Sequence, residues 1–417
     1  MRRVVLALML SLALVVAGAA PALAQNSPVE IVNWWTAGGE EDALIALFEV
    51  FRDQHPEFEP ISSAVAGGAG TDAKAVMITR LVGGNPPDSF QVHGGAELFH
   101  SYVDPGFMQP VTHLLEEWDV VDDFNPEILD LVRGEDGEIY SVPLNIHRSN
   151  VMWTNQRILE EHGLEAPETI EEMFDVFEAL EEAGVTPLAL GDLNRWPTLH
   201  LFENLMLATM GPEDYNALWD GTVTFDHEGL REALELLDQA LEYVNPDHAA
   251  LDWQGAAELL VEDEAVFNVM GDWAEGYFRA VGWEPLEDYG WTTVPGTEGN
   301  FMVVTDTFGL PEGISNPEGA RAWLQTVASR EGQDAFNPIK GSIPARIDPD
   351  VERYSIYLQS SIEDFAQDNL TPSIAHGSAA PEGFVSEFED ILNEFVTVRD
   401  VDHTLDRMQT IAGEYLN

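Results

Sequence analysis

The chain of 417 residues contains no cysteine, so no disulfide can stabilise it and no thiolate can bind a metal. Lysine is nearly absent too, because only Lys74 and Lys340 occur. Eighteen basic residues stand against 75 acidic ones, which gives a net charge of −57. Nucleic acids and anionic membranes are bound through lysine and arginine, so this charge argues against both as partners.

An excess of acidic residues has two further interpretations. Disorder is one, but 45% hydrophobic and 10% aromatic residues are typical of a folded protein with a sizeable core. The other is a folded protein adapted to strong brine, where salt screens the repulsion between surface carboxylates. We favour the halophilic interpretation, which concerns habitat and solubility rather than activity.

Motifs for catalysis are also missing. The sequence has no His-Glu-x-x-His, no calcium loop of alternating aspartates and no Gly-x-Ser-x-Gly. The glycine run at 67–70 lacks the Gly-Lys-Ser/Thr ending of a phosphate loop, and we expect it to be a plain loop leading into a helix. Paired carboxylates can hydrolyse glycosides, but among 75 acids almost any pair arises by chance. We therefore expect a protein that is not an enzyme and has no metal or cofactor.

The first segment predicts secretion. Arg2 and Arg3 precede an apolar run over 4–18, and Ala22-Leu23-Ala24 follows with small residues at the positions that a signal peptidase reads. A membrane anchor is the alternative, but the run is short for a span. We expect a cleaved signal peptide at 1–24. Since no cysteine is available for a lipid, we expect a periplasmic protein that is not a lipoprotein.

Short apolar strands alternate with amphipathic helices along the rest of the chain, which favours an α/β fold. The remaining length of about 390 residues is more typical of two domains than of one. The predicted strands are 29–34, 61–65, 88–93, 265–270 and 302–308. The predicted helices are 40–54, 71–82, 169–184 and 229–243, with further helices around Trp323 and over 384–395.

Tryptophan is abundant, with 11 residues, and several lie at predicted strand ends. In α/β proteins ligands bind at the carboxyl ends of strands. Trp34-Trp35, His93 and Asp272-Trp273 fall at such ends. Indole rings cover the apolar C–H faces of sugars, while polar side chains satisfy the hydroxyl groups in pairs. These residues therefore indicate a sugar site.

Seven segments in a fixed order resemble the extracellular solute-binding proteins of ABC importers (family 1), in the branch that binds glucose and related hexoses. They are 32–40, 84–88, 143–148, 269–274, 305–308, 338–346 and 375–377. The resemblance implies a type II-like periplasmic binding protein with sugar in the cleft between two lobes and a hinge of crossing segments. It implies an N-terminal lobe of 25–142 plus 297–345 and a C-terminal lobe of 143–296 plus 346–417.

The resemblance also implies the ligand-binding residues. Trp34 and Trp35 resemble the aromatic wall, although one of them is expected to be core. Trp253 and Trp273 would frame the other side. The polar partners of the hydroxyl groups would be Glu40, Gln91, His93, Asp306, Lys340 and His376.

Some of these residues have a second interpretation. Glu40 fits equally well as an acid favoured by the dipole of a first helical turn. Gln91 fits a strand surface and Asp306 a turn. Trp196 and Trp219 could extend the cleft but are expected to be core. Lys340 is the most telling, since one of only two lysines falls inside a matching segment.

The implied function is delivery of a neutral monosaccharide to the permease subunits of an ABC importer, by a monomer. Glucose is expected first, then galactose, mannose or xylose. A secreted glycoside hydrolase and a sugar sensor without a transport role remain as alternatives.

Overall fold

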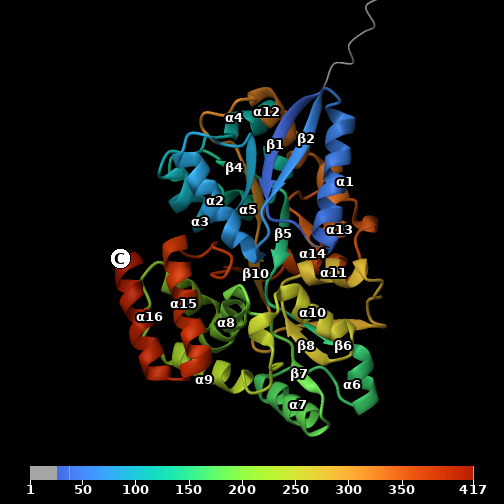
Figure 1. The fold of residues 1–417 in the computed structure, drawn as a ribbon, viewed down its shortest axis with the longest axis vertical. Coiled ribbons are helices and arrows are strands. Elements are labelled where there is room, and N and C mark those ends of the chain that lie inside the picture. Colours follow the sequence, from blue (N-terminus) through green and yellow to red (C-terminus); the bar gives the residue numbers. More distant parts are fainter. Residues whose placement is uncertain (1–25, 37, 417) are drawn as a thin grey trace, which may run out of the picture.

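The computed structural model describes residues 26–36 and 38–416, so the predicted signal peptide 1–24 lies outside it. The described chain forms three sheets. Two of them are each flanked by helices and form two lobes, and the third lies between the lobes (Figure 1). The protein is therefore an α/β protein of two lobes, as the sequence predicted. No helix in the described ranges combines the length and the apolar character of a membrane span.

The N-terminal lobe, the upper half of Figure 1, is built on a five-stranded sheet. β1 pairs in parallel with β2 and β3, and β11 runs antiparallel to β3 and β4. The strands in spatial order are β2 (Phe58–Ala64), β1 (Ser27–Asn33), β3 (Ser89–His93), β11 (Asp306–Gly309) and β4 (Ser141–Pro143). Its helices are α1 (Gly38–Gln54), α2 (Thr71–Val82), α3 (Ala96–Leu98), α4 (Thr112–Glu117), α5 (Pro126–Asp130), α12 (Pro317–Ala328) and α13 (Arg330–Lys340).

The C-terminal lobe, the lower half of Figure 1, is built on a four-stranded sheet. Its strands in spatial order are β7 (Thr186–Leu188), β8 (Ala265–Val269), β6 (Val151–Asn155) and β9 (Tyr289–Thr293). Its helices are α6 (Gln156–His162), α7 (Ile170–Glu182), α8 (Trp196–Trp219), α9 (Glu228–Ala240), α10 (Trp253–Val261), α11 (Trp273–Ala280), α15 (Glu382–Val398) and α16 (Val401–Tyr415).

The middle sheet carries the chain between the lobes. Its strands are β12 (Ile343–Pro344), β5 (Asn145–Arg148), β10 (Asn300–Val304) and β13 (Asn369–Pro372), with α14 (Ile356–Phe365) in contact with β12. β4 of the N-terminal lobe leads into β5 after one residue, and β10 leads into β11 in the same way. Short crossing segments of this kind are suited to the hinge motions of two-lobe proteins.

The strand predicted over 302–308 is in fact two strands. β10 lies in the middle sheet and β11 in the N-terminal sheet, with Thr305 between them. The Thr305 hydroxyl donates to the Asn145 carbonyl at 2.7 Å, which ties the two crossing segments together where they change sheets. An apolar run gives no sign of such a change, because every residue of both strands is buried.

The helices follow the predicted periods. In α1 the residues Leu44, Leu47, Phe48 and Phe51 are buried on one face, against α12 and α13. α2 has the predicted bounds. The N-cap is Gly70 in the left-handed conformation, with no side-chain hydrogen bond.

Candidate functional site

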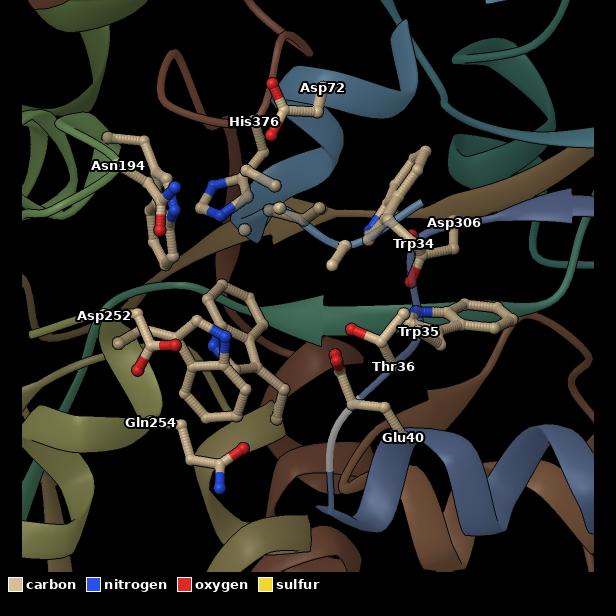
Figure 2. Close-up of a pocket in the computed structure, with 18 of the residues that line it drawn as sticks. Trp34, Trp35, Thr36, Glu40, Asp72, Asn194, Asp252, Gln254, Asp306 and His376 are labelled. Carbon is tan, nitrogen blue, oxygen red and sulfur yellow. The ribbon is translucent and has the colours of Figure 1, made fainter. Parts of the chain in front are cut away.

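A cavity of about 310 Å³ lies between the two lobes. Figure 2 shows side chains of the N-terminal lobe, such as Trp34 and Glu40, facing Asn194, Asp252 and Gln254 of the C-terminal lobe across it. The lining residues are Trp34, Trp35, Thr36, Glu40, Ala66, Gly67, Gly68, Ala69, Asp72, His93, His147, Leu193, Asn194, Trp196, Asp252, Trp253, Gln254, Trp273, Val304, Asp306, Lys340 and His376. Nine of the ten predicted binding residues are among them; Gln91 is not.

Several aromatic rings line the cavity. The Trp34 ring centroid lies 4.9 Å from that of His93, and Trp273 lies 5.3 Å from His147 and 5.0 Å from His376. Trp35 differs from its neighbour, because its indole packs against Phe308 and Phe336 in the core. The expectation that one member of this pair is core therefore applies to Trp35.

Asp306 is the carboxylate at which several polar side chains in and behind the cavity wall meet. Gln91 Nε2 donates to its Oδ1 at 2.7 Å, and Asn145 Nδ2 donates to its Oδ2 at 2.8 Å. Gln91 Oε1 also accepts the Trp34 backbone N–H at 3.2 Å. Gln91 thus lies behind the cavity wall, where it fixes Trp34 and Asp306, instead of facing a ligand as the sequence suggested.

Two histidines face the same carboxylate. His93 Nε2 lies 3.7 Å from Asp306 Oδ1, and His147 Nε2 lies 3.4 Å from Oδ2. Burial alone would raise the pKa of Asp306, but the hydrogen bond and charge of His147, with the charges of His93 and Lys340, hold it well below its ordinary value. Asp306 is therefore a carboxylate that accepts hydrogen bonds.

The cavity also contains a buried ion pair between Lys340 and Glu40. Lys340 Nζ lies 3.1 Å from Glu40 Oε1 and 5.8 Å from the centre of the Trp273 ring. The side chain of Lys340 is 2% exposed and that of Glu40 is 14% exposed. Burial raises the pKa of Glu40, and the attraction of Lys340 offsets only part of that shift. Glu40 lies in the first turn of α1 and also lines the cavity, so its position is compatible with both interpretations.

His376 is held by a buried carboxylate that the sequence did not reveal. Glu203 Oε2 accepts the backbone N–H groups of Ile374 and Ala375 at 2.8 and 3.0 Å, and the Ser373 hydroxyl lies 2.9 Å from both carboxylate oxygens. The same hydroxyl lies 2.9 Å from His376 Nδ1. These bonds fix the turn that presents His376 to the cavity.

His200, Glu203 and His376 place nitrogen and oxygen atoms within 4.8 Å of one another, a spacing that suits a metal ion. The Ser373 hydroxyl already bridges Glu203 and His376, and both Glu203 oxygens accept hydrogen bonds. The group is therefore well explained as a hydrogen-bonded support, and we assign no metal to it.

The glycine run forms a wall of the cavity, not the plain loop expected from sequence. A Cβ atom at Gly68 would lie 2.4 Å from Trp196 Nε1, and one at Gly70 would lie 2.7 Å from the Trp34 ring. Gly70 also has a φ of +74°. The loop thus passes between an indole of each lobe, and only glycine fits this approach. Trp196, expected to be core, is buried and lines the cavity at the same time.

Sequence reasoning missed several other lining residues, among them Thr36, Asp72, His147, Asn194, Asp252 and Gln254. His147 and Thr36 lie inside segments 143–148 and 32–40, so the resemblance had reached their positions. Asn194, Asp252 and Gln254 lie in the C-terminal lobe, in stretches without a distinctive pattern.

Two lobes joined by crossing strands, with an aromatic and polar cavity between them, define a binding protein that encloses a small ligand. The family model of the bacterial extracellular solute-binding proteins matches residues 37–334. This chain belongs to that family.

Relatives of similar length support the assignment. An uncharacterised ABC transporter extracellular-binding protein of Pyrococcus horikoshii is 39% identical over 90% of this chain and 85% of its own. A probable sugar-binding periplasmic protein of Mesorhizobium japonicum is 31% identical over 88% of both chains. The xylose/arabinose-binding protein XacG of Haloferax volcanii is 29% identical over 85% of this chain and 77% of its own.

Solved structures share the fold. A bacterial solute receptor for β-D-galactopyranose has a TM-score of 0.83 and 18% identity, with 94% of this chain and 100% of the other covered. A chitin oligosaccharide binding protein also has a TM-score of 0.83 and 18% identity, over 94% and 99% of the two chains.

Proposed function

We propose that this chain is the sugar-binding component of an ABC importer and that its ligand is a neutral monosaccharide, glucose first. The observation that carries the proposal is the interlobe cavity, where Trp34, Trp253 and Trp273 meet the hydrogen-bonding groups of Asp306 and His93. Such a cavity supplies apolar faces for the C–H side of a sugar and partners for its hydroxyl groups. A hydroxyl group left without a partner there would cost about 1–3 kcal/mol, which favours one hydroxyl pattern over others.

The size and charge of the cavity support a small neutral ligand. Its volume of about 310 Å³ is at the small end of the range for ligand pockets, about 300–1,000 Å³. Lys340 is paired with Glu40, and Asp306 is surrounded by donors, so a charged ligand would find no free counter-ion in either group. The name of XacG also favours single sugars, and pentoses such as xylose remain alternatives.

The transport role rests on the family. Members bind their ligand outside the cytoplasmic membrane, and we infer a periplasmic location and permease subunits as partners. Closure of the lobes around the sugar would create the surface that the permease recognises, while the chain itself performs no chemistry. We expect a monomer. A sensor would have the same cavity, and uptake by cells lacking this gene would separate the two roles.

Thermal melting in high salt against glucose, galactose, mannose, xylose and short oligosaccharides tests the proposal. A ligand at one hundred times its dissociation constant adds about 2.7 kcal/mol to the free energy of unfolding, which raises Tm by a few degrees. We expect the largest shift with glucose. A shift only with oligosaccharides would contradict the monosaccharide, and turnover of a chromogenic glycoside would contradict the binding-only role.

A further inference from the structure

Lys74, the other of the two lysines, lies in a buried ionic cluster. It projects from α2 of the N-terminal lobe and is 9% exposed. Its Nζ atom lies 2.9 Å from Glu97 Oε2 and 3.1 Å from Glu382 Oε2. Glu97 belongs to α3 of the same lobe, whereas Glu382 begins α15 of the C-terminal lobe. One ammonium group therefore joins three elements and both lobes.

Glu97 connects this cluster to the cavity. The Oε2 atom that pairs with Lys74 also accepts a hydrogen bond from His93 Nδ1 at 2.9 Å. The bond fixes the imidazole ring with Nε2 toward Asp306, 3.7 Å away. Because a histidine is oriented by the partner of its other nitrogen, Glu97 determines which His93 atom faces a ligand.

The backbone around Glu97 also contacts the segment leading into α15. Glu97 N donates to the Gly377 carbonyl at 2.8 Å, and Ala96 N donates to the Ser378 carbonyl at 3.1 Å. A Cβ atom at Gly377 would lie 2.8 Å from Glu97 Oε2. His376 precedes this glycine and lines the cavity, as His93 does. The ionic cluster therefore contacts the segments that carry both histidines.

We propose that Lys74 is a positioning residue of the binding site, which pairs Glu97 with Glu382 across the lobes and thereby orients His93 while holding the cleft closed. The inference rests on the proposed function, because it assigns His93 to a ligand. Without the cation, two carboxylates would face each other across the lobes, and the buried Glu97 would have lost its main counter-charge. Their repulsion would favour the open form, and Glu97, no longer fixed by Lys74, would no longer hold the His93 ring in one orientation.

The test compares three substitutions with a matched control. Lys74→Met removes the cation, Glu382→Gln breaks only the contact across the lobes, and Lys74→Arg restores the charge. The control is Arg80→Gln on the same helix, because Arg80 pairs with Glu30 inside the N-terminal lobe, at 2.7 Å. For glucose, we expect the dissociation constant to rise about tenfold or more with Lys74→Met and less with Glu382→Gln. Lys74→Arg should recover most of the affinity, and Arg80→Gln should change little.

Two readouts separate positioning from general stability. The absence of cysteine allows spin labels at Val82→Cys and Val398→Cys, which are exposed residues of the two lobes. Without sugar, Lys74→Met and Glu382→Gln should lengthen the distance between the labels. The ¹⁵N shifts of His93 should show a proton fixed on Nδ1 in the wild-type protein and lose that preference in Lys74→Met.

Folded Lys74→Met with wild-type affinity and wild-type label distance would overturn the proposal. If that variant does not fold, unchanged values in Glu382→Gln would do so instead. The label distances need no ligand, so they test the cluster even if the wild-type protein binds no sugar. That last outcome would contradict the proposed function. The label distances alone would then test the contact between the lobes.

Discussion

Trp273 is the side chain around which the cavity is arranged. Lys340 lies over its ring, and the rings of His147, Trp196 and His376 surround it. A Cβ atom at Gly271 would lie 2.2 Å from the same indole, so the glycine of Gly271-Asp272-Trp273 makes room for it. Trp35 instead fills the core between Phe308 and Phe336. Loss of Trp273 should therefore affect ligand binding, whereas loss of Trp35 should affect the stability of the fold.

Trp273→Ala should weaken glucose binding by about 2–4 kcal/mol, because it removes the central contact surface of the cavity. Trp35→Ala should lower the free energy of unfolding by about 3–5 kcal/mol, since it leaves a core cavity. Calorimetric titration and denaturant unfolding measure the two quantities. Trp118→Ala, at a site away from the cavity, is the control for affinity. Equal loss of affinity in Trp273→Ala and Trp118→Ala would contradict the assigned site.

Glu275, buried on α11, should make stability depend on pH. Burial raises its pKa to about 7 despite the nearby Arg279. The unfolded chain releases this proton near pH 4.5 and the folded chain near 7, so the free energy of unfolding falls as pH rises between these values. The loss amounts to about 3 kcal/mol by pH 8. Glu275→Gln should match the wild type at pH 5 and exceed it by about 2–3 kcal/mol at pH 8; a constant difference would refute the assignment.

Three helix ends meet where the lobes approach each other. A Cβ atom at Gly39 in α1 would lie 2.9 Å from the Gly276 carbonyl of α11, and one at Gly276 would lie 2.5 Å from the Lys340 carbonyl of α13. Gly341, the C-cap of α13, would place a Cβ atom 2.6 Å from the Asp272 carbonyl. Glycine at these positions lets α11 of one lobe reach α1 and α13 of the other, and this approach places Trp273 beside Lys340.

Gly341→Ala should therefore cost more than backbone strain alone. Gly313 is a matched control, because its φ of +76° resembles the +80° of Gly341 and its Cβ position is open. Gly313→Ala should lower the free energy of unfolding by about 1–2 kcal/mol. Gly341→Ala should lower it by a further 1–3 kcal/mol or so and weaken sugar binding as well. Equal costs and unchanged affinity in both variants would show that the lobe contact is unimportant.

The sequence predicted individual helices and strands better than it predicted the contacts between distant residues. Helices such as α7 and strands such as β8 follow their predicted bounds closely, because hydrophobic periods are local. The change of sheet at Thr305 and the cavity wall at Gly68 depend on distant partners, Asn145 and Trp196. Lys340 could be predicted as a site residue, because lysine is rare in this chain and Lys340 lies in a segment that resembles the family. Glu203 could not be identified from the sequence, since nothing distinguishes one acid among 75 until the fold buries it.

The whole molecule carries a charge of −57, which opposes its own compact state. Several arginines pair with acids at the surface, among them Arg52 with Glu59 and Arg231 with Asp402, but exposed pairs contribute little each. Most of the 75 acids cannot have a basic partner, because the chain has only 18 basic residues. We therefore expect stability to depend on ions from the solvent.

Tm should rise markedly with salt, by at least about 5 °C between roughly 0.1 and 1 M, as the Debye length falls from about 10 to about 3 Å. Melting followed by circular dichroism in sodium chloride measures this dependence. Potassium chloride at the same ionic strength should give the same shift if screening is the cause. A Tm that is indifferent to salt would contradict the halophilic interpretation.

The burial of both lysines has a chemical consequence for a sugar-binding protein. Open-chain reducing sugars carry an aldehyde, which condenses with unprotonated amines and slowly attaches carbohydrate to proteins. Here the side-chain amines are limited to Lys74 and Lys340, and each is held as an ammonium ion against a carboxylate. An ammonium ion has no lone pair with which to attack, and guanidinium groups supply the other positive charges. The chain therefore offers almost no side-chain amine for glycation.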